Sequence, residues 1–131
     1  MRARDIMTPH PLTLQPFTRI GEAITLMHDN DVRHVPVVRG AQHVGILSDR
    51  DLRALWHPGQ DLRGDGRVYD RAVEDFMSTD PITVIAETDI DDVIDLLIEH
   101  RIGALPVIDA DGDLIGIVSA IDVLQAAQGR F

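Results

Sequence analysis

The sequence contains neither cysteine nor lysine, and its apolar runs are short. Without cysteine, the chain has no disulfide framework, no thiolate nucleophile and no cysteine-based zinc site. No apolar run approaches the roughly 18 residues that suggest a membrane-spanning helix, and the opening MRARDIMTPH lacks the apolar core of a signal peptide. We therefore expect a cytoplasmic protein that does not enter a membrane.

Basic residues are scarce, since 12 arginines stand against 22 acidic residues and give a formal net charge of -10. A nucleic-acid-binding surface needs a basic face that displaces counterions, so we expect no nucleic-acid partner. The imbalance lies in the second half of the chain. Residues 72–131 hold two arginines against thirteen acids, whereas residues 1–56 hold seven against six.

Patterns typical of catalytic and metal sites are absent from the sequence. The six histidines include no HxH or HxxxH pair, and no serine lies in a GxSxG turn. We therefore expect no metal site, no required cofactor and no enzymatic activity. Asp109–Asp113 begins like a calcium loop but lacks the closing glutamate, and we interpret it as a hairpin turn.

An internal repeat covers most of the chain. A shift of 70 residues places DIM (5–7) on DFM (75–77) and PLTL (11–14) on PITV (81–84), and one extra residue in the second copy then makes the shift 71. We expect two copies, residues 1–56 and 71–131, joined by a linker loop at residues 57–70. Further identical pairs are Thr18/Thr88, Ile20/Ile90, Ile24/Ile94, Leu26/Leu96, Pro36/Pro106, Val37/Val107, Gly45/Gly116, Ile46/Ile117, Ser48/Ser119 and Asp51/Asp122.

Apolar periodicity changes in the same order within each copy. PLTL and PITV indicate short strands, and Thr18 and Thr88 are the expected N-caps of the amphipathic helices that follow. A hairpin and a closing helix come next in each copy. The predicted fold is α+β, two tandem β-α-β-β-α repeats packed sheet to sheet with pseudo-twofold symmetry. The expected hairpin strands are residues 34–38, 43–48, 104–108 and 114–119, and the expected closing helices are residues 49–56 and 120–128.

The first copy reads DIM, PLTL, VRHVPVV and VGILSDRDL, and the second repeats the order as DFM, PITV, IGALPVI and LIGIVSAID. The order of these motifs resembles the CBS-domain family. The resemblance implies a tandem pair, often called a Bateman module. Such pairs bind AMP, ATP or S-adenosylmethionine in clefts between the repeats, and many are attached to an enzyme, channel or transporter. Because the resemblance covers nearly the whole chain and leaves no room for such an effector, we expect a stand-alone regulatory module.

Ser48 and Asp51 stand where a predicted strand ends and a helix begins. The resemblance implies that Asp51 accepts hydrogen bonds from the two ribose hydroxyls and that Ser48 donates near the ribose or phosphate. The S-x-x-D spacing also fits a helix capping box, a structural role that Ser48 can combine with binding.

Arg33 and His34 lie where several family members place basic residues that bind phosphate. An arginine there can clamp phosphate oxygens with its forked guanidinium group. The alternative is a solvated cation at a helix end that pairs with Asp29 or Asp31. Asp49 and Arg50 complete the charged candidates of the first copy.

The second copy repeats Ser119 and Asp122 but replaces the charges around them. Gly103 and Ala104 stand where the first copy has an arginine and a histidine, although His100 and Arg101 lie just upstream. We therefore expect this half to reject a phosphorylated ligand. Asp49 and Arg50 are likewise replaced by Ala120 and Ile121.

Weaker candidates occupy the strands of both copies, each beside a structural alternative. Thr13 and Thr83 resemble residues that meet a base or phosphate, but a β-branched residue also suits a strand. The apolar pairs before each hairpin turn are candidates for a wall against a base, while the strand glycines indicate close packing against a helix. These residues are Val35, Pro36, Leu105 and Pro106 for the wall and Gly45 and Gly116 for the packing, with Trp56 and Tyr69 expected as packing residues near the linker.

The leading functional hypothesis is a regulatory sensor of an adenine nucleotide, AMP, ADP or ATP, with S-adenosylmethionine less favoured. We also expect a homodimer, formed through apolar helix faces, and an unidentified protein effector. The alternative is a ligand-independent module for dimerisation or protein interaction. The two hypotheses differ in one measurable property: a nucleotide stabilises the fold of a sensor but not that of a ligand-independent module.

Overall fold

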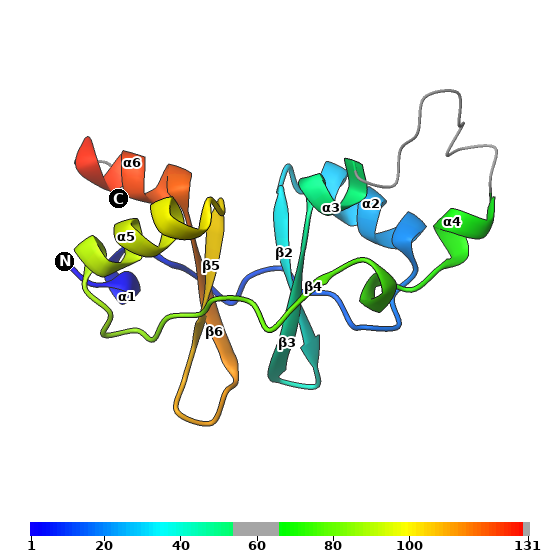
Figure 1. The fold of residues 1–131 in the computed structure, drawn as a ribbon, viewed down its shortest axis with the longest axis horizontal. Helices are drawn as coiled ribbons and strands as arrows, with labels where there is room; N and C mark the ends of the chain where they lie inside the picture. The colour runs from blue at the N-terminus through cyan, green and yellow to red at the C-terminus, as the bar shows by residue number, and fades with distance from the viewer. Residues whose placement is uncertain (54–65, 130–131) are drawn as a thin grey trace. The chain divides into compact units, whose positions relative to one another are not determined.

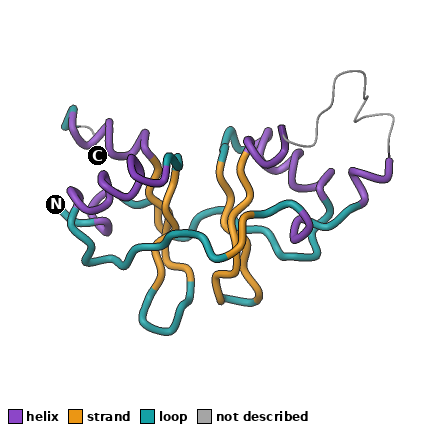
Figure 2. The backbone as a smooth tube through the Cα atoms, in the orientation of Figure 1, coloured by secondary structure: helices purple, strands orange, loops and turns teal. Residues whose placement is uncertain are grey.

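The computed structural model describes residues 1–53 and 66–129, which fall into two compact units. Unit 1 consists of Met1–Pro11, Ala41–His43 and Pro81–Phe131, and unit 2 of Leu12–Gly40 and Val44–Asp80. Each unit holds a three-stranded sheet with helices beside it (Figures 1 and 2). The α+β class and the two repeats are thereby confirmed, while the packing of sheet against sheet stays a prediction.

Unit 2 carries the hairpin of the first copy. Its sheet has the order β2-β3-β4. The amphipathic helix α2 buries Ile20, Ala23 and Met27, so the predicted apolar stripe faces the core. The elements are α2 (Ile20–Asp29), β2 (His34–Arg39), β3 (Gln42–Ser48), α3 (Asp49–Arg53), α4 (Gly66–Asp70), the 3-10 turn η1 (Val73–Asp75) and β4 (Ser78–Thr79).

Unit 1 repeats this plan with the hairpin of the second copy. Its sheet has the order β1-β6-β5, and helix α5 buries Val93 and Leu97. The elements are α1 (Ala3–Ile6), β1 (Thr8–Pro9), α5 (Ile90–His100), β5 (Ala104–Ile108), β6 (Leu114–Ser119) and α6 (Ala120–Ala127).

Each sheet takes its third strand from the opposite copy. The first-copy leader (residues 1–11) supplies β1, which pairs antiparallel with β6, and the second-copy leader (residues 71–80) supplies β4, which pairs with β3. The leaders also supply acceptors for the first helical N–H groups. Ile90 N–H donates to Met1 O at 3.0 Å, and Ile20 N–H donates to Arg71 O at 2.9 Å. The two copies are therefore interlocked through their leaders.

The apolar cores follow from the same exchange. Ala3 and Ile6 of the first-copy leader lie in the core of unit 1, and Val73 of the second-copy leader lies in the core of unit 2. Burial removes these side chains from water, at about 25 cal/mol per Å² of apolar surface. The leaders therefore contribute packing as well as hydrogen bonds.

The predicted helix caps are wrong by one residue. The N-caps are Arg19 and Asp89, and the Asp89 carboxylate accepts from Asp91 N–H at 3.2 Å. Thr18 and Thr88 instead close the preceding turns, because their hydroxyls accept from the backbone N–H groups of Gln15 and Ile85 at 3.0 and 3.1 Å. These hydroxyls therefore accept from N–H groups that precede them in the chain, not from the N–H groups of the helix that follows.

The predicted strands PLTL and PITV are reduced to single parallel bridges, Leu14 to Val37 and Val84 to Val107. The four hairpin strands match their predictions closely. Residues 66–70, predicted as part of an exposed loop, form α4. There Tyr69 packs close to Gly21, as expected of a packing residue, whereas Trp56 lies outside the described residues.

The strand glycines accommodate the leaders rather than a helix. A Cβ on Gly45 would lie 2.6 Å from Met77 Sδ and 2.9 Å from Ser78 O, and one on Gly116 would lie 2.6 Å from Met7 Sδ. The predicted close packing is confirmed, but its partner is the methionine that precedes the edge strand. The last residue of DIM and of DFM thus packs against a strand glycine of the opposite copy.

No helix among the described residues is long and apolar enough to cross a membrane. Within the same residues, no group of three or more His, Cys, Asp or Glu side chains is placed to hold a metal ion.

We expect Gly45→Ala to lower the free energy of unfolding by about 1 to 3 kcal/mol, because the added Cβ overpacks the strand. Gly116→Ala should be milder. Its nearest backbone atom, Thr8 O, lies 3.1 Å from the added Cβ, and the Met7 side chain can move. Urea unfolding of the two variants checks this order. Equal stability of both variants with wild type would contradict the tight packing.

Candidate ligand-binding site

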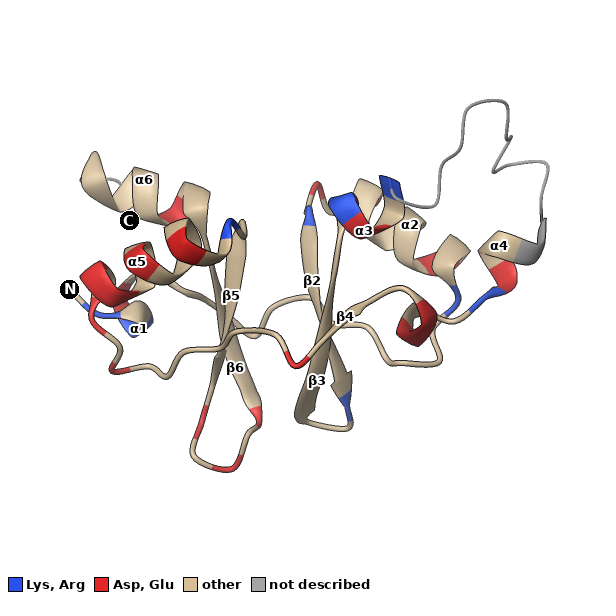
Figure 3. Ribbon diagram, in the orientation of Figure 1, with Lys and Arg blue, Asp and Glu red and all other residues tan. Residues whose placement is uncertain are grey.

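The charged candidates of the first copy meet where β2 begins and α3 begins. Asp49 N–H donates to Arg33 O at 2.9 Å, which holds the two elements together. Arg33 and His34 thus lie beside Asp49, Arg50 and the following turn of α3. Figure 3 shows basic and acidic residues gathered over α3 and the adjoining end of β2. We call Arg33, His34, Ser48, Asp49, Arg50 and Asp51 the first-copy site.

Ser48 and Asp51 form the capping box that their spacing predicts. Ser48 Oγ accepts from Asp51 N–H at 3.2 Å, and Ser48 N–H donates to Asp51 Oδ2 at 2.9 Å. Both residues are half-buried. Because a carboxylate offers about four acceptor positions, this structural role leaves Asp51 the capacity to accept further hydrogen bonds.

Charges of both signs surround His34, the first residue of β2. Arg33 and Arg50 are exposed, while Asp49 and Asp51 are half-buried. Burial lowers the pKa of His34. The negative charges of Asp49 and Asp51 raise it, and the positive charges of Arg33 and Arg50 lower it further. The net effect lowers the pKa of His34 below its usual value and favours the neutral imidazole.

The second-copy site has the same backbone and different side chains. Ala120 N–H donates to Gly103 O at 2.9 Å, matching the bond between Asp49 and Arg33. Ser119 and Asp122 repeat the capping box at 2.8 and 3.1 Å. Gly103, Ala104, Ala120 and Ile121 add no charge. The two sites share a geometry and differ in their electrostatics.

The apolar candidates lie in the cores. The side chains of Val35, Pro36, Leu105 and Pro106 are fully buried, so a wall against a base stays a prediction. The Pro36 and Pro106 carbonyls accept from Leu14 and Val84 N–H, each at 3.0 Å. These bonds place the half-buried Thr13 and Thr83 next to the middle of β2 and β5.

Comparison with known proteins identifies the repeated unit. The sequence matches the CBS domain family twice, at residues 3–57 and 73–129. The chain belongs to the CBS domain family.

Proteins with a similar CBS pair occur in plants and bacteria. CBSX2, a chloroplastic CBS domain-containing protein of Arabidopsis thaliana, is 31% identical over 94% of this chain and 62% of its own. YhcV of Bacillus subtilis is 33% identical over 92% of this chain and 81% of its own. The inosine-5'-monophosphate dehydrogenase of Thermoplasma acidophilum is 33% identical, but the match spans only 23% of that enzyme. The CBS pair therefore occurs in chains of different length.

A solved structure of CBSX2 in complex with AMP superimposes with a TM-score of 0.84 and 34% identity. The match covers 98% of this chain and 96% of that one. A putative acetoin utilization protein from Vibrio cholerae matches with the same TM-score and 29% identity over 98% of this chain and 91% of its own.

Arg53 is a charged neighbour of this CBS pair's first-copy site that we did not predict. Its guanidinium group lies 3.6 Å from Asp49 Oδ2, one helical turn away. The spacing of four residues between an acid and a base on a helix is the signal that identifies such a pair. With Arg53 included, three arginines and two aspartates lie on α3 or just before β2.

We expect Ser48→Ala and Ser119→Ala each to lower the free energy of unfolding by about 1 kcal/mol, because a helical N–H loses its acceptor. Ser78→Ala, at an exposed position in β4, is the matched control and should remain within about 0.5 kcal/mol of wild type. Chemical denaturation measures all three. If the two capping variants are no less stable than Ser78→Ala, the capping boxes do not form.

Proposed function

We propose that this CBS pair is a regulatory ligand-sensing module that binds an adenosine-containing nucleotide, AMP, ADP or ATP, mainly through the first-copy site. The observation that carries the proposal is the bond between Asp49 N–H and Arg33 O. It brings a forked cation, a histidine and a capping carboxylate to one place. A relative of 34% identity, CBSX2, has been solved in complex with AMP, which supports this class of ligand.

Each residue of the first-copy site has a distinct role in the proposal. Asp51 accepts from the ribose hydroxyls while its Oδ2 atom keeps the capping bond with Ser48. Arg33 clamps the phosphate oxygens with two parallel N–H donors, a charge-assisted geometry that neutral side chains cannot provide. Asp49 is held by Arg53 on the adjacent helical turn, so its negative charge is partly balanced.

The second-copy site does not take a phosphorylated ligand in this proposal. A phosphate that leaves water needs charge-assisted hydrogen bonds in its place, and Gly103 and Ala104 offer only backbone groups. The second half of the chain is also acidic, with thirteen acids against two arginines in residues 72–131, which disfavours an anion. This site suits a neutral or cationic adenosyl group, such as S-adenosylmethionine, better than a nucleotide.

We expect AMP at 100 times its Kd to raise the free energy of unfolding of wild type by about 2.7 kcal/mol. A module that acts only through protein contacts would show no such stabilisation. Thermal unfolding at fixed protein concentration, with and without AMP, measures the difference.

We expect Arg33→Ala and Asp51→Ala to weaken AMP binding at least roughly tenfold to 150-fold, since each variant loses one or more charge-assisted hydrogen bonds. Asp122→Ala is the matched control, since it removes the same capping carboxylate from the second-copy site. Titration calorimetry compares the three variants. AMP binding that is lost in Asp122→Ala and intact in the other two would reverse the assignment of the sites.

A second function, association through the helices, is supported by exposed apolar side chains on unit 1. Ile98 is 71% exposed, and Ile121 and Leu124 are each 60% exposed. We propose that this face contributes to an isologous homodimer, and an effector protein of unknown identity is a further candidate partner. None of these three side chains belongs to the first-copy site.

We expect sedimentation to show a dimer at tens of micromolar protein. The double variant Ile121→Arg and Leu124→Arg should shift the protein toward monomer, because it places two positive charges on the apolar face. The matching first-copy positions are already arginines, Arg50 and Arg53. A wild-type monomer at that concentration would contradict the dimer.

A further inference from the structure

His34 differs from an ordinary surface histidine in its position. It is the first residue of β2, is half-buried, and lies where Asp49 N–H binds Arg33 O at 2.9 Å. The capping box fixes Asp51 on the same turn of α3. The imidazole therefore lies inside the proposed nucleotide site, among groups held by backbone bonds.

The charges that act on His34 come from two places among the described residues. Asp49, Arg50 and Asp51 belong to α3, and Arg33 precedes β2. The neighbouring strand β3 has His43 as its one titratable residue, and residues 11–16 have none. The acids at the end of α2, Asp29 and Asp31, are exposed and do not contribute to the balance.

This balance favours the neutral form of His34 in the free protein. Burial is the largest effect and lowers the pKa of His34, while the two aspartates raise it and the two arginines lower it. A phosphate held by Arg33 would add one or two negative charges beside the imidazole. An added anion favours the protonated form, so it acts against burial.

We propose that the first-copy site takes up a proton at His34 when it binds a phosphorylated adenosine ligand, which makes His34 a determinant of specificity for phosphorylated over uncharged ligands. The proton comes from solvent and is added to the unprotonated ring nitrogen. No covalent bond of the ligand changes. This inference rests on the proposed function of the first-copy site.

A proton taken up on binding links affinity to pH. The pKa of His34 is higher in the complex than in the free protein, so the added binding energy is fully present below the free pKa and is lost as pH rises through the bound pKa. Between the two values, AMP affinity should fall by up to about tenfold per pH unit. Adenosine lacks the phosphate, so its affinity should not follow this dependence.

Two measurements on the full chain test the inference. The first follows the ring proton signals of His34 by NMR from pH 5 to 8.5, for the free protein and with saturating AMP or adenosine. The second is titration calorimetry with AMP at pH 7 in two buffers of different ionisation enthalpy, which counts the protons taken up. The calorimetry is repeated on His34→Gln, and the ring signals missing from the NMR spectrum of this variant assign those of His34.

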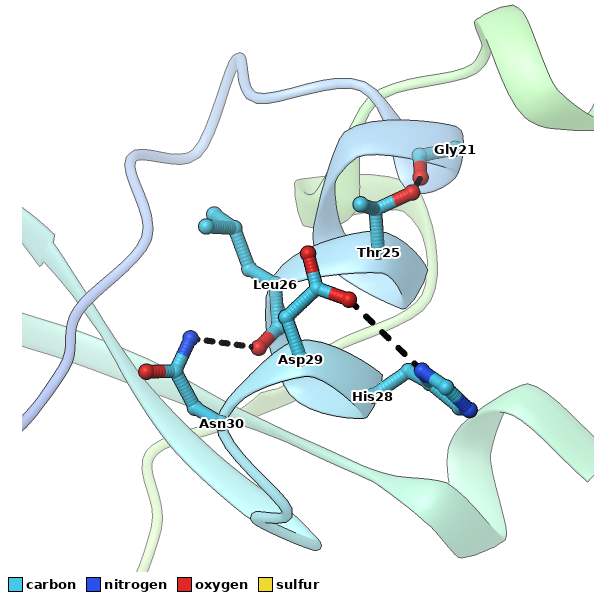
Figure 4. A network of polar contacts seen from close by, with 6 residues as sticks. All are labelled: Gly21, Thr25, Leu26, His28, Asp29 and Asn30. Atoms are coloured by element: carbon cyan, nitrogen blue, oxygen red, sulfur yellow. Dashed lines mark hydrogen bonds and ion pairs between the residues drawn. The ribbon is translucent and has the colours of Figure 1, made fainter.

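His28→Gln is the matched control. His28 lies on α2, is exposed, pairs with Asp29 at 3.6 Å (Figure 4), and is not one of the first-copy site residues. It should keep the proton uptake of wild type. The phosphate of AMP has its own pKa of about 6 and is coupled to the imidazole in the complex. The difference between wild type and His34→Gln measures the proton uptake that depends on the histidine, and the NMR titration assigns the proton to its ring.

The expected result is a higher pKa of His34 with AMP than without, no rise with adenosine, and less proton uptake in His34→Gln than in His28→Gln. AMP binding to wild type without a rise in the pKa of His34 overturns this inference and leaves the proposed function intact. Failure of wild type to bind AMP overturns the proposed function, and this inference with it.

Discussion

Both units depend on the backbone bonds that each leader forms with the opposite copy. Ile20 N–H and Ile90 N–H lie at helix starts, where no carbonyl of the same helix can accept, and Arg71 O and Met1 O satisfy them. The leaders also supply the third strand of each sheet and apolar residues for each core. Helix α3 follows β3 directly, and β3 pairs with the leader strand β4. The completed sheet therefore positions the charged residues of the first-copy site.

Much of the fold could be predicted because apolar spacing reports local structure directly. The hairpin strands and the stripes of α2 and α5 follow from periods of two and 3.6 residues. The leader strands contain two residues each, too few to show a period. Their crossed pairing was hidden for another reason. Met7 and Met77 occupy equivalent positions, so the repeat alone fits either glycine, Gly45 or Gly116.

The candidate site was predictable in its backbone and less so in its environment. An antiparallel hairpin returns the chain, so the residue after β3 lies beside the residue before β2, and Asp49 meets Arg33. The spacing of Ser48 and Asp51 predicted their capping box. The half-burial of His34 depends on packing from several segments. Sequence spacing contains no information on that packing, so the depressed pKa of His34 needed the structure.

The exchange of leaders has a consequence for how the two copies diverge. In this arrangement a separate copy would complete its sheet only by borrowing a leader from another molecule, and its folding would depend on dilution. Fusion in one chain replaces that dependence with an effective concentration on the order of millimolar. The borrowed contacts are backbone bonds and apolar packing in the cores and at the strand glycines, and Arg50 and Ile121 belong to neither. Arg50 and Ile121 can therefore differ while the interlocking persists, so that the two copies keep one backbone frame and carry different charges.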